Sequence, residues 1–469
     1  MSKIAEKLNI IQNSMIDIKR AIIEKTGENV YGDITTYGKL IREIYSTPYK
    51  HHQFNLSQVR KIYTTFFYDS LSSALNDINS SNVVGNTTDE ENAVIAVCQG
   101  RKQYYVFLLK NLQVSSTIEL TNIRFILNGN TLESDADVVF NMLSNAIIDG
   151  STPNSKISYT RYTDGLNRLI NASGENNKML GGIYNIIDSG NGTITAPEFL
   201  INVEGEFEVD NVLFNAVDNG GGTVRIFHSN VDSTLNIKNS DLTVTSAEGL
   251  QSYCVQVEGN VYAEDSSFVV LSNHCANAAG TDYGQTGRPM YTETGSTLTL
   301  KNCYVYGAHS GITVKGNLYV DGGTYCGYSH GGFYLSNGAA HNTHIKNAKI
   351  IEVDLAEGFI DDGVAGTNHA GMYTGAAIGM QIYIDNCMFY GLQQPIVLKH
   401  SSSSSYNNTI FISNSSMNKD YTHYGFRNDG NNYVKFGVNN DFDENNLKNK
   451  QNFEYTEEDY GEINNENAV

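Results

Sequence analysis

The chain has 469 residues with 43 glycines, five prolines, 30 tyrosines and no tryptophan, and its formal net charge at pH 7 is −20. The acidic balance argues against a nucleic-acid binder or a protein of anionic membrane surfaces, because both kinds of partner require clustered Lys and Arg. No apolar run approaches the roughly 18 residues needed to cross a bilayer.

Residues 1–47 are predicted to form a small helical module for attachment or oligomerisation. Its apolar residues follow the four-three spacing of a coiled-coil seam: Ile4, Leu8, Ile11, Met15, Ile18 and Ile22. These side-chain shapes favour a coiled coil of three or more helices, and packing onto a second helix at 35–45 is an equal alternative. Residues 48–65 are expected to be a linker. His51 and His52 there lack ligand partners at useful spacing, so no metal site is expected.

The segment FFYDSLSSALNDIN (66–79) has the pattern of a short amphipathic helix with Leu71, Ala74, Leu75 and Ile78 on its apolar face. Strand-like segments follow at 104–109, 117–120 and 123–127. Such a helix could cover the open first coil of a repeat structure, where strand edges and core would otherwise be exposed.

A ten-residue unit recurs from Phe207 onward. Its copies begin at Phe207, Leu235, Val261, Leu298, Leu318, Thr343, Ile382 and Ile410. In LNIKNSDLTV (235–244) apolar residues occupy places one, three and eight, and only the copy at Thr343 departs from the scheme. Places one and three share a strand face, whereas place eight would face the other way on a straight strand. The backbone must therefore bend between them.

The fifth place of the unit holds residue types that tolerate a left-handed backbone: Asn211, Asn239, Asp265, Asn302, Gly322, Asn347, Asn386 and Asn414. Strand, corner and strand, repeated along the sequence, predict stacked coils. An antiparallel sandwich or propeller would require hairpin turns and a more uniform repeat, and neither is evident. We predict an all-β protein: a single-stranded right-handed parallel β-helix over 66–440, with an N-terminal helical cap and the small α-helical module.

Residues 441–469 form an Asn-rich tail with nine acidic and two basic residues, for which a solvated end is the expected state. The six cysteines show no CxxC pair and no metal-ligand spacing, so free and largely buried thiols are expected. No secretory signal opens the sequence, and we expect folding in a reducing cytoplasm.

Two motifs carry a resemblance to a known family. The opening LNIIQNSMIDIKRAIIEKTGENVYGDITTYGKLIREI resembles the N-terminal module of tail and appendage proteins of phages that infect gut anaerobes, including crAss-like phages. The SLSSALNDIN entry into β-helix coils is similar to pectate-lyase-like tail spikes. The resemblance implies a virion tail protein, assembled in the host cytoplasm as a homotrimer. It would attach to other tail proteins through the module and adsorb to bacterial surface polysaccharide.

Relatives of this fold include lyases and glycoside hydrolases, so catalysis must be weighed. The resemblance carries over only one hydrolase element, the pair Asp361 and Asp362 in GFIDDGVAG. Adjacent aspartates on a strand face opposite ways, so the pair could cooperate only in a loop, and capping of a turn beside Gly363 is the alternative. No cofactor is expected.

Long intervals between coils indicate a binding face. The two longest, 272–296 and 354–381, contain the candidate glycan-binding residues: Tyr283, Arg288, Tyr291, His369 and Tyr373. Irregular turns without a ligand are the alternative. Three functions follow in order of preference: a non-enzymatic adsorption spike, a spike that degrades capsule or exopolysaccharide, and a purely structural virion component.

Overall fold

The computed structural model describes most of the residues after position 55. The described ranges are 56–161, 168–188, 199–218, 224–246, 252–272, 287–307, 310–328, 331–336, 341–353, 370–375, 379–391, 394–398, 408–419, 424–428, 432–442, 447–448 and 452–460. The predicted helical module, its seam, the second helix and residues 48–55 of the predicted linker lie outside these residues.

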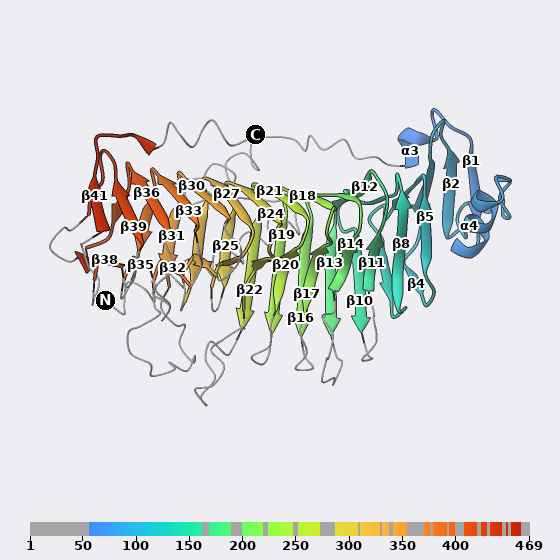
Figure 1. Cartoon of the computed structure of the whole chain (residues 1–469). Helices are drawn as coiled ribbons and strands as arrows, with labels where there is room; N and C mark the ends of the chain where they lie inside the picture. The colour runs from blue at the N-terminus through green and yellow to red at the C-terminus, as the bar shows by residue number, and fades with distance from the viewer. Residues whose placement is uncertain are drawn as a thin grey trace, which may run out of the picture. The chain divides into compact units, whose positions relative to one another are not determined.

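The described part of the protein is a right-handed parallel β-helix, as predicted. Successive strands lie in three sheets, A, B and C, and beyond the antiparallel pairs at the N-terminal end each strand pairs with the strand one coil away rather than with its neighbour in sequence (Figure 1). The pairing of β15 (Glu206–Asp210) with β18 (Thr234–Lys238), for example, is parallel. The polypeptide divides into two compact units, which within the described residues are 56–218 with 234–242, and 224–233 with 243–460.

The first unit contains the N-terminal strands. Sheet A has β1 (Thr65–Tyr68), β2 (Ile95–Gln99), β3 (Tyr104–Leu108), β6 (Ile123–Ile126), β9 (Ile147–Gly150), β12 (Asn177–Gly181), β15 (Glu206–Asp210) and β18 (Thr234–Lys238). Sheet B has β4 (Leu112–Val114), β7 (Thr131–Ser134), β10 (Lys156–Arg161), β13 (Ile183–Asp188) and β16 (Leu213–Asp218). Sheet C has β5 (Ile118–Thr121), β8 (Val138–Ser144), β11 (Arg168–Ala172) and β14 (Phe199–Val203).

The second unit repeats the three-sheet arrangement. Sheet A has β21 (Asn260–Glu264), β24 (Thr297–Lys301), β27 (Asn317–Asp321), β30 (Asn342–Lys346), β33 (Gln381–Asp385), β36 (Thr409–Ser413), β39 (Tyr433–Phe436) and β41 (Phe453–Tyr455). Sheet B has β19 (Asp241–Ser246), which begins in the first unit, then β22 (Ser267–Ser272), β25 (Tyr304–Gly307), β28 (Thr324–Gly327), β31 (Lys349–Glu352), β34 (Met388–Tyr390) and β37 (Ser416–Met417). Sheet C has β17 (Arg225–Ser229), β20 (Tyr253–Val257), β23 (Met290–Thr292), β26 (Ile312–Val314), β29 (Phe333–Leu335), β32 (Met372–Thr374), β35 (Ile396–Leu398), β38 (Phe426–Asn428) and β40 (Leu447–Lys448).

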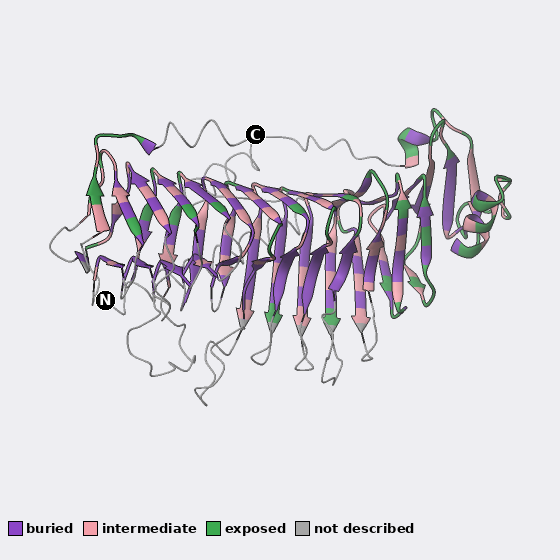
Figure 2. Ribbon diagram, in the orientation of Figure 1, coloured by how far each residue is buried: buried purple, intermediate pink, exposed green. Residues whose placement is uncertain are grey.

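The repeat places its apolar residues inside the coils. In the copy at 235–244, Leu235, Ile237 and Leu242 are all 0% exposed. The first places of successive copies are direct partners, as in Leu298↔Leu318 and Ile382↔Ile410. Figure 2 shows this alternation of buried and exposed positions along the strands. Stacking therefore buries a continuous apolar interior that one coil could not form alone.

The fifth place of each copy is a sharp corner between sheets A and B. All eight residues predicted there have a positive φ, between 47° and 78°. Their side chains also join neighbouring coils: Asn386 Nδ2 donates to Asn347 Oδ1 at 2.8 Å, and Asn414 Nδ2 to Asp385 Oδ1 at 2.8 Å. At Gly322 a Cβ would lie 2.3 Å from Asn302 Oδ1, which explains the one glycine in the row.

The first coils turn differently. Asn122, Asn145 and Asn176 also have positive φ, but they lie between strands of sheet C and sheet A. They form their own ladder, with Asn145 Nδ2 donating to Asn122 Oδ1 at 3.1 Å and Asn176 Nδ2 to Asn145 Oδ1 at 3.3 Å. The same device therefore serves a second corner, which the ten-residue repeat does not include.

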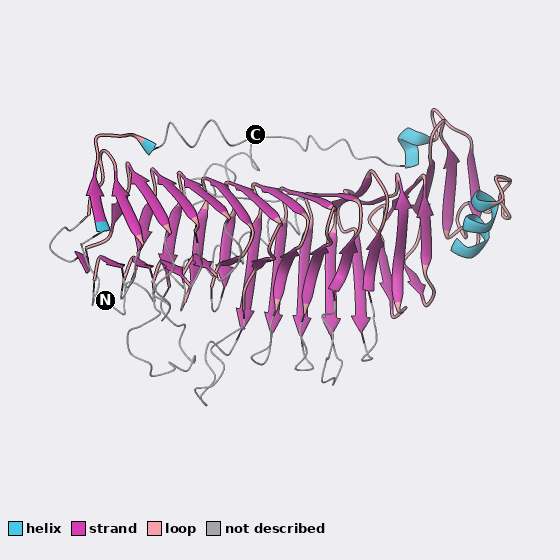
Figure 3. Cartoon of the chain, in the orientation of Figure 1, coloured by secondary structure: helices cyan, strands magenta, loops and turns pink. Residues whose placement is uncertain are grey.

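The N-terminal end is closed by antiparallel strands and a helix. Strand β1 pairs antiparallel with β2, and β2 antiparallel with β3, before the parallel coils begin. A short helix α3 (Leu56–Val59) precedes them, and α4 (Leu71–Asn79) contacts β1 and β2 (Figure 3). The prediction that the helix begins at residue 66 was wrong: Phe66–Tyr68 belong to β1, and Ser70 caps the helix because its hydroxyl accepts from Ser73 N.

Two further results concern the C-terminal segment and the thiols. Strands β40 and β41 pair with β38 and β39, so the coils extend to Tyr455 rather than ending at residue 440. The predicted solvated tail from residue 441 was therefore wrong for these strands. Five cysteines, Cys98, Cys254, Cys303, Cys326 and Cys387, are free and buried, whereas Cys275 lies outside the described residues.

Candidate functional site: a cleft on sheet C

A cleft of about 390 Å³ opens on the outer face of sheet C in the second unit. Five successive strands, β17, β20, β23, β26 and β29, or the residues next to them, provide its walls. The lining comprises three cations (Arg225, Arg288, Lys315), three tyrosines (Tyr253, Tyr291, Tyr334) and three further polar residues (Gln256, Glu293, Ser336). Cationic and aromatic side chains therefore share one concave surface.

The strand register brings these side chains together. Gln256 pairs with Tyr291, Tyr291 with Thr313, and Thr313 with Tyr334, so one outward position is occupied in four consecutive coils. The alternate positions, Val255, Met290, Ile312 and Phe333, are 0% exposed and face the interior. Because neighbouring parallel strands lie about 4.8 Å apart, side chains distant in sequence become adjacent along the axis.

Both arginines of the cleft are buried. Arg225 and Arg288 are 9% and 8% exposed, and burial lowers the pKa of each guanidinium below its ordinary value. An arginine keeps its charge at neutral pH even so. The Arg225 Cζ lies 4.8 Å from the Tyr253 ring centroid, and the Arg288 Cζ lies 6.0 Å from that of Tyr334. The rings thus support the two guanidinium planes.

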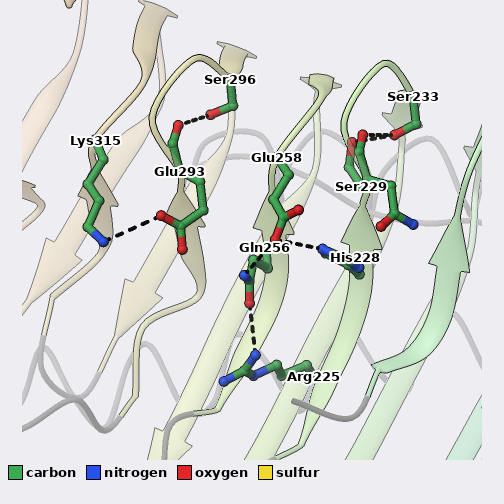
Figure 4. A network of polar contacts seen from close by, with 10 residues as sticks. Arg225, His228, Ser229, Ser233, Gln256, Glu258, Glu293, Ser296 and Lys315 are labelled. Carbon is green, nitrogen blue, oxygen red and sulfur yellow. Dashed lines mark hydrogen bonds and ion pairs between the residues drawn. The ribbon is translucent and has the colours of Figure 1, made fainter. Parts of the chain in front are cut away.

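A series of polar contacts fixes Arg225. Its Nη1 donates to Gln256 Oε1 at 2.9 Å, and Gln256 Nε2 donates to Glu258 Oε1 at 3.3 Å (Figure 4). Glu258 Oε1 also lies 3.0 Å from His228 Nε2. The Gln256 amide therefore links the Arg225 guanidinium to the Glu258 carboxylate by two hydrogen bonds, and these fix the Arg225 side chain at the cleft.

The opposite part of the cleft holds Lys315. Its Nζ lies 3.4 Å from Glu293 Oε2 and 4.8 Å from the Tyr291 ring centroid. Burial lowers the pKa of Lys315, but Tyr291 and Glu293 outweigh this effect and leave the pKa above its ordinary value. Lys315 therefore stays positively charged throughout the neutral range. Tyr253 and Tyr291 lie side by side, with ring centroids 5.5 Å apart.

The predicted site residues have different positions in the structure. Arg288 and Tyr291 line the cleft. Tyr373 is not among the lining residues: it is the register partner of Tyr334 on the next coil, is 2% exposed, and its ring centroid lies 5.5 Å from that of Tyr334. Tyr283, His369, Asp361 and Asp362 lie outside the described residues.

Seven lining residues were not predicted, and they include Arg225, Lys315 and Tyr334. Six of them lie outside the two long intervals, where no insertion marks them, whereas Glu293 lies within 272–296. Aligning the strands of sheet C in register would have found the row, because Gln256, Tyr291 and Tyr334 occupy the same outward position.

Among the residues that the structure describes, no three His, Cys, Asp or Glu side chains are grouped to hold a metal ion. No described helix has both the length and the apolar character to cross a bilayer.

Comparisons with known proteins gave two structural similarities, whereas no family model and no curated protein matches the sequence. One is the catalytic unit of a thermostable GH87 alpha-1,3-glucanase from Streptomyces thermodiastaticus strain HF3-3, with a TM-score of 0.41 and 10% identity. The other is a GH87 alpha-1,3-glucanase catalytic domain in complex with nigerose, with a TM-score of 0.34 and 13% identity. Each covers 76% of this protein, which spans 65% and 64% of those proteins. At these values the similarities carry no argument about activity.

Proposed function

We propose that this protein binds a bacterial surface polysaccharide in the sheet C cleft, as an adsorption protein of a phage tail. The observation that carries the binding proposal is the gathering of three tyrosines and three cations from five successive coils into one cleft. The tail assignment rests on the N-terminal and SLSSALNDIN motifs in the sequence.

The composition of the cleft suits a polysaccharide. Tyrosine rings offer apolar faces for pyranose rings together with hydroxyls for hydrogen bonds, and the volume of about 390 Å³ is that of a small-molecule site. Strands on a parallel β-helix repeat along the axis, so a polymer can extend past the cleft over neighbouring coils. Binding without cleavage requires no more than these contacts.

A matched pair of clusters provides the test. Tyr291, Glu293 and Lys315 in the cleft have a counterpart on sheet A, where Tyr262 donates to Glu264 Oε2 at 3.0 Å and Lys301 Nζ lies 2.6 Å from Glu264 Oε1. Tyr291→Ala and Lys315→Ala should each weaken retention on host polysaccharide by roughly tenfold or more. Tyr262→Ala and Lys301→Ala should leave retention unchanged. Full retention by both cleft variants would remove the cleft from the proposal.

The tail role has its own test. Particles carrying a deletion of residues 1–50 should lack this protein, while the purified truncated protein should still bind host cells and block infection. Sedimentation of the full-length protein should give the mass of a homotrimer. If the truncated protein still joins the particle, the assignment of the N-terminal module fails.

A second candidate function is degradation of the bound polysaccharide. It is favoured by the position of the Tyr291 ring under the Lys315 ammonium, because a tyrosine beside a cation can act as an acid or base. Release of reducing ends or unsaturated sugars, lost in Tyr291→Phe, would establish it. Loss in Asp361→Asn or Asp362→Asn would instead place the chemistry at the predicted aspartate pair. A protein that neither binds nor cleaves host glycan would be a structural virion component.

A further inference from the structure

We propose that a row of alternating charges on the outer face of sheet A sets the order in which successive coils pair during folding. This charge row is place four of the repeat unit, which faces outward because places one and three face the interior. On five consecutive coils of the second unit, place four holds Glu264, Lys301, Asp321, Lys346 and Asp385. The sign of the charge reverses at every coil, so register partners in the row always carry opposite charges.

The partners in the charge row lie close together. Lys301 Nζ is 2.6 Å from Glu264 Oε1, and Lys346 Nζ is 3.5 Å from Asp321 Oδ2. These four side chains are between 23% and 48% exposed, and ion pairs at such exposure stabilise a folded protein only weakly. The alternation is therefore better explained by what it excludes than by the stability that it adds.

The other rows of sheet A do not distinguish one coil from the next but one. Place one is aliphatic in most copies, as at Leu298 and Leu318, and place five is a left-handed corner residue in all of them. Place two holds stacked rings on three successive coils, those of Tyr319, His344 and Tyr383. A strand paired with the wrong coil would therefore bury similar side chains and meet an equivalent corner.

The charge row does distinguish them. If the coil of Lys301 paired with that of Lys346 and left out the coil of Asp321, two ammonium groups would become register partners. Like charges directly opposite each other on neighbouring strands are destabilising, whereas opposite charges are stabilising. In the native state a coil left out would also lose its buried interior, so the native order needs little further support there. We therefore expect the charge row to act on folding intermediates, in which repeat proteins are prone to mispairing.

Two introduced cysteines would report the omission of one coil. Thr297 and Asn342 occupy the outward place that precedes place one, on coils two apart: Thr297 pairs with Asn317, and Asn342 N donates to Asn317 Oδ1 at 3.1 Å. In the native order their α-carbons are about 10 Å apart, two strand spacings, whereas a disulfide requires roughly 4.4–6.8 Å. Omission of the coil of Asp321 makes the two positions direct partners. Thr297→Cys with Asn342→Cys should therefore form a disulfide in the mispaired order and not in the native one.

The experiment compares this cysteine pair in the full-length protein with different charge rows. Each protein is refolded from denaturant, oxidised by a short pulse at an early time, and analysed by peptide mapping for the disulfide. Lys346→Glu sets Lys301 opposite a carboxylate in the mispaired order and sets Asp321 opposite one in the native order. Relative to the unchanged charge row, it should raise the disulfide fraction roughly threefold or more.

Two further proteins test whether the pattern of sign is the cause. Lys435→Glu reverses a charge that is paired with Glu454 at 3.5 Å on sheet A but lies outside the charge row, and it should leave the disulfide fraction unchanged. The triple variant Lys301→Glu, Asp321→Lys and Lys346→Glu restores alternation on three coils with the signs inverted. Its disulfide fraction should return to that of the unchanged charge row.

The outcomes are decisive in either direction. An unchanged disulfide fraction in Lys346→Glu overturns the proposal, and so does an equal rise in Lys435→Glu. A fraction in the triple variant as high as in Lys346→Glu would assign the effect to the loss of Lys346 and would also overturn it. Because the pulse precedes the end of folding, a variant that does not reach the native state is still measured. No glycan enters the experiment, so its result is independent of the proposed function.

Discussion

Two regions of the second unit use the same stacking in opposite ways. At the corner between sheets A and B, each coil places an Asn, Asp or Gly in the same left-handed conformation, and asparagine side chains link one coil to the next. On the outer face of sheet C, one register position holds Gln256, Tyr291, Thr313 and Tyr334 in turn. Similar residues in successive coils stabilise the corner, whereas different residues at one register position form the cleft on sheet C.

The corner thiols provide the strongest way to test this contrast. Cys303 and Cys387 follow the corner residues Asn302 and Asn386, and burial raises the pKa of each thiol to about 12. Relative to the ordinary thiol pKa of 9.0, a pKa of about 12 lowers the thiolate fraction roughly 1000-fold. Thiol reagents should therefore label Cys303 and Cys387 far more slowly in the folded protein than in the unfolded protein, as peptide mapping of the labelled sites would show. Rapid labelling of either residue in the folded protein at pH 8 would contradict a closed corner.

The same thiols predict a pH dependence of stability. Above about pH 9 the thiols of the unfolded protein ionise, whereas the folded thiols remain protonated until about pH 12. Because the raised pKa belongs to the folded state, its stabilising contribution is complete below pH 9 and is lost as the pH rises through this window. The free energy of unfolding, measured in denaturant at a series of pH values, should fall between pH 9 and 12. Cys303→Ser and Cys387→Ser should reduce the slope.

A buried ion pair in the first unit should give the next largest effect. Asp149 is 0% exposed and accepts from Arg124 Nε at 2.8 Å and from Ser151 N at 2.9 Å. Arg124→Ala should lower the free energy of unfolding by about 3–5 kcal/mol, because it leaves a buried carboxylate without its cation. The control is Lys178→Ala, whose partly exposed pair with Glu208 should contribute less than about 1 kcal/mol. Similar losses in both variants would mean that burial does not set the cost.

A corner asparagine should matter less than the buried pair. Asn386→Ala removes the hydrogen bond to Asn347 and places a β-carbon at a φ of 48°, and together these should cost about 2–3 kcal/mol. Asn386→Gly loses only the hydrogen bond and should cost about 1 kcal/mol. Denaturant unfolding of both variants distinguishes backbone conformation from the ladder. Equal losses would assign the whole effect to the side-chain bond.

The smallest effect should have the opposite sign. Thr343 occupies the first place of its repeat copy, is 0% exposed, and its hydroxyl has no hydrogen-bond partner among the described residues. Thr343→Val restores the apolar pattern at nearly the same size. It should raise the free energy of unfolding by about 1 kcal/mol, because a buried hydroxyl without a partner is costly. Thr343→Ser, which keeps the hydroxyl and loses a methyl group, should be destabilising.

The corners were predictable because two patterns of the repeat unit agree. Few residue types other than Asn, Asp and Gly tolerate the left-handed backbone at place five, and the apolar residues at places one, three and eight can share the interior only if the backbone bends between them. The ten-residue unit was not found in the earlier coils because Asn122, Asn145 and Asn176 mark a different corner. The start of α4 was misplaced because Phe66 and Phe67 suit a helix face and an antiparallel strand equally well, and only pairing with β2 decides between them.

The site was only partly predictable. Arg288 was found because it lies in a long interval between coils, whereas Arg225 and Lys315 lie in short ones. The burial of Tyr373 could not be predicted, since a tyrosine near a long interval gives no sign of its depth, and the residue lies beside Tyr334 on the next coil. Whether two side chains on successive coils are neighbours depends on the register between their strands. Local sequence patterns do not give this register until every strand is aligned.

The connections from sheet B to sheet C differ greatly in length. In one coil the connection runs from Ser272, the end of β22, to Met290, the start of β23. In the next coil it runs only from Gly307 to Ile312, yet β23 and β26 pair in register. Inserted sequence at these connections therefore leaves the surrounding strands in place. Such a scaffold can acquire, lengthen or exchange the segments beside its cleft during evolution, so that ligand preference diversifies while folding is inherited unchanged.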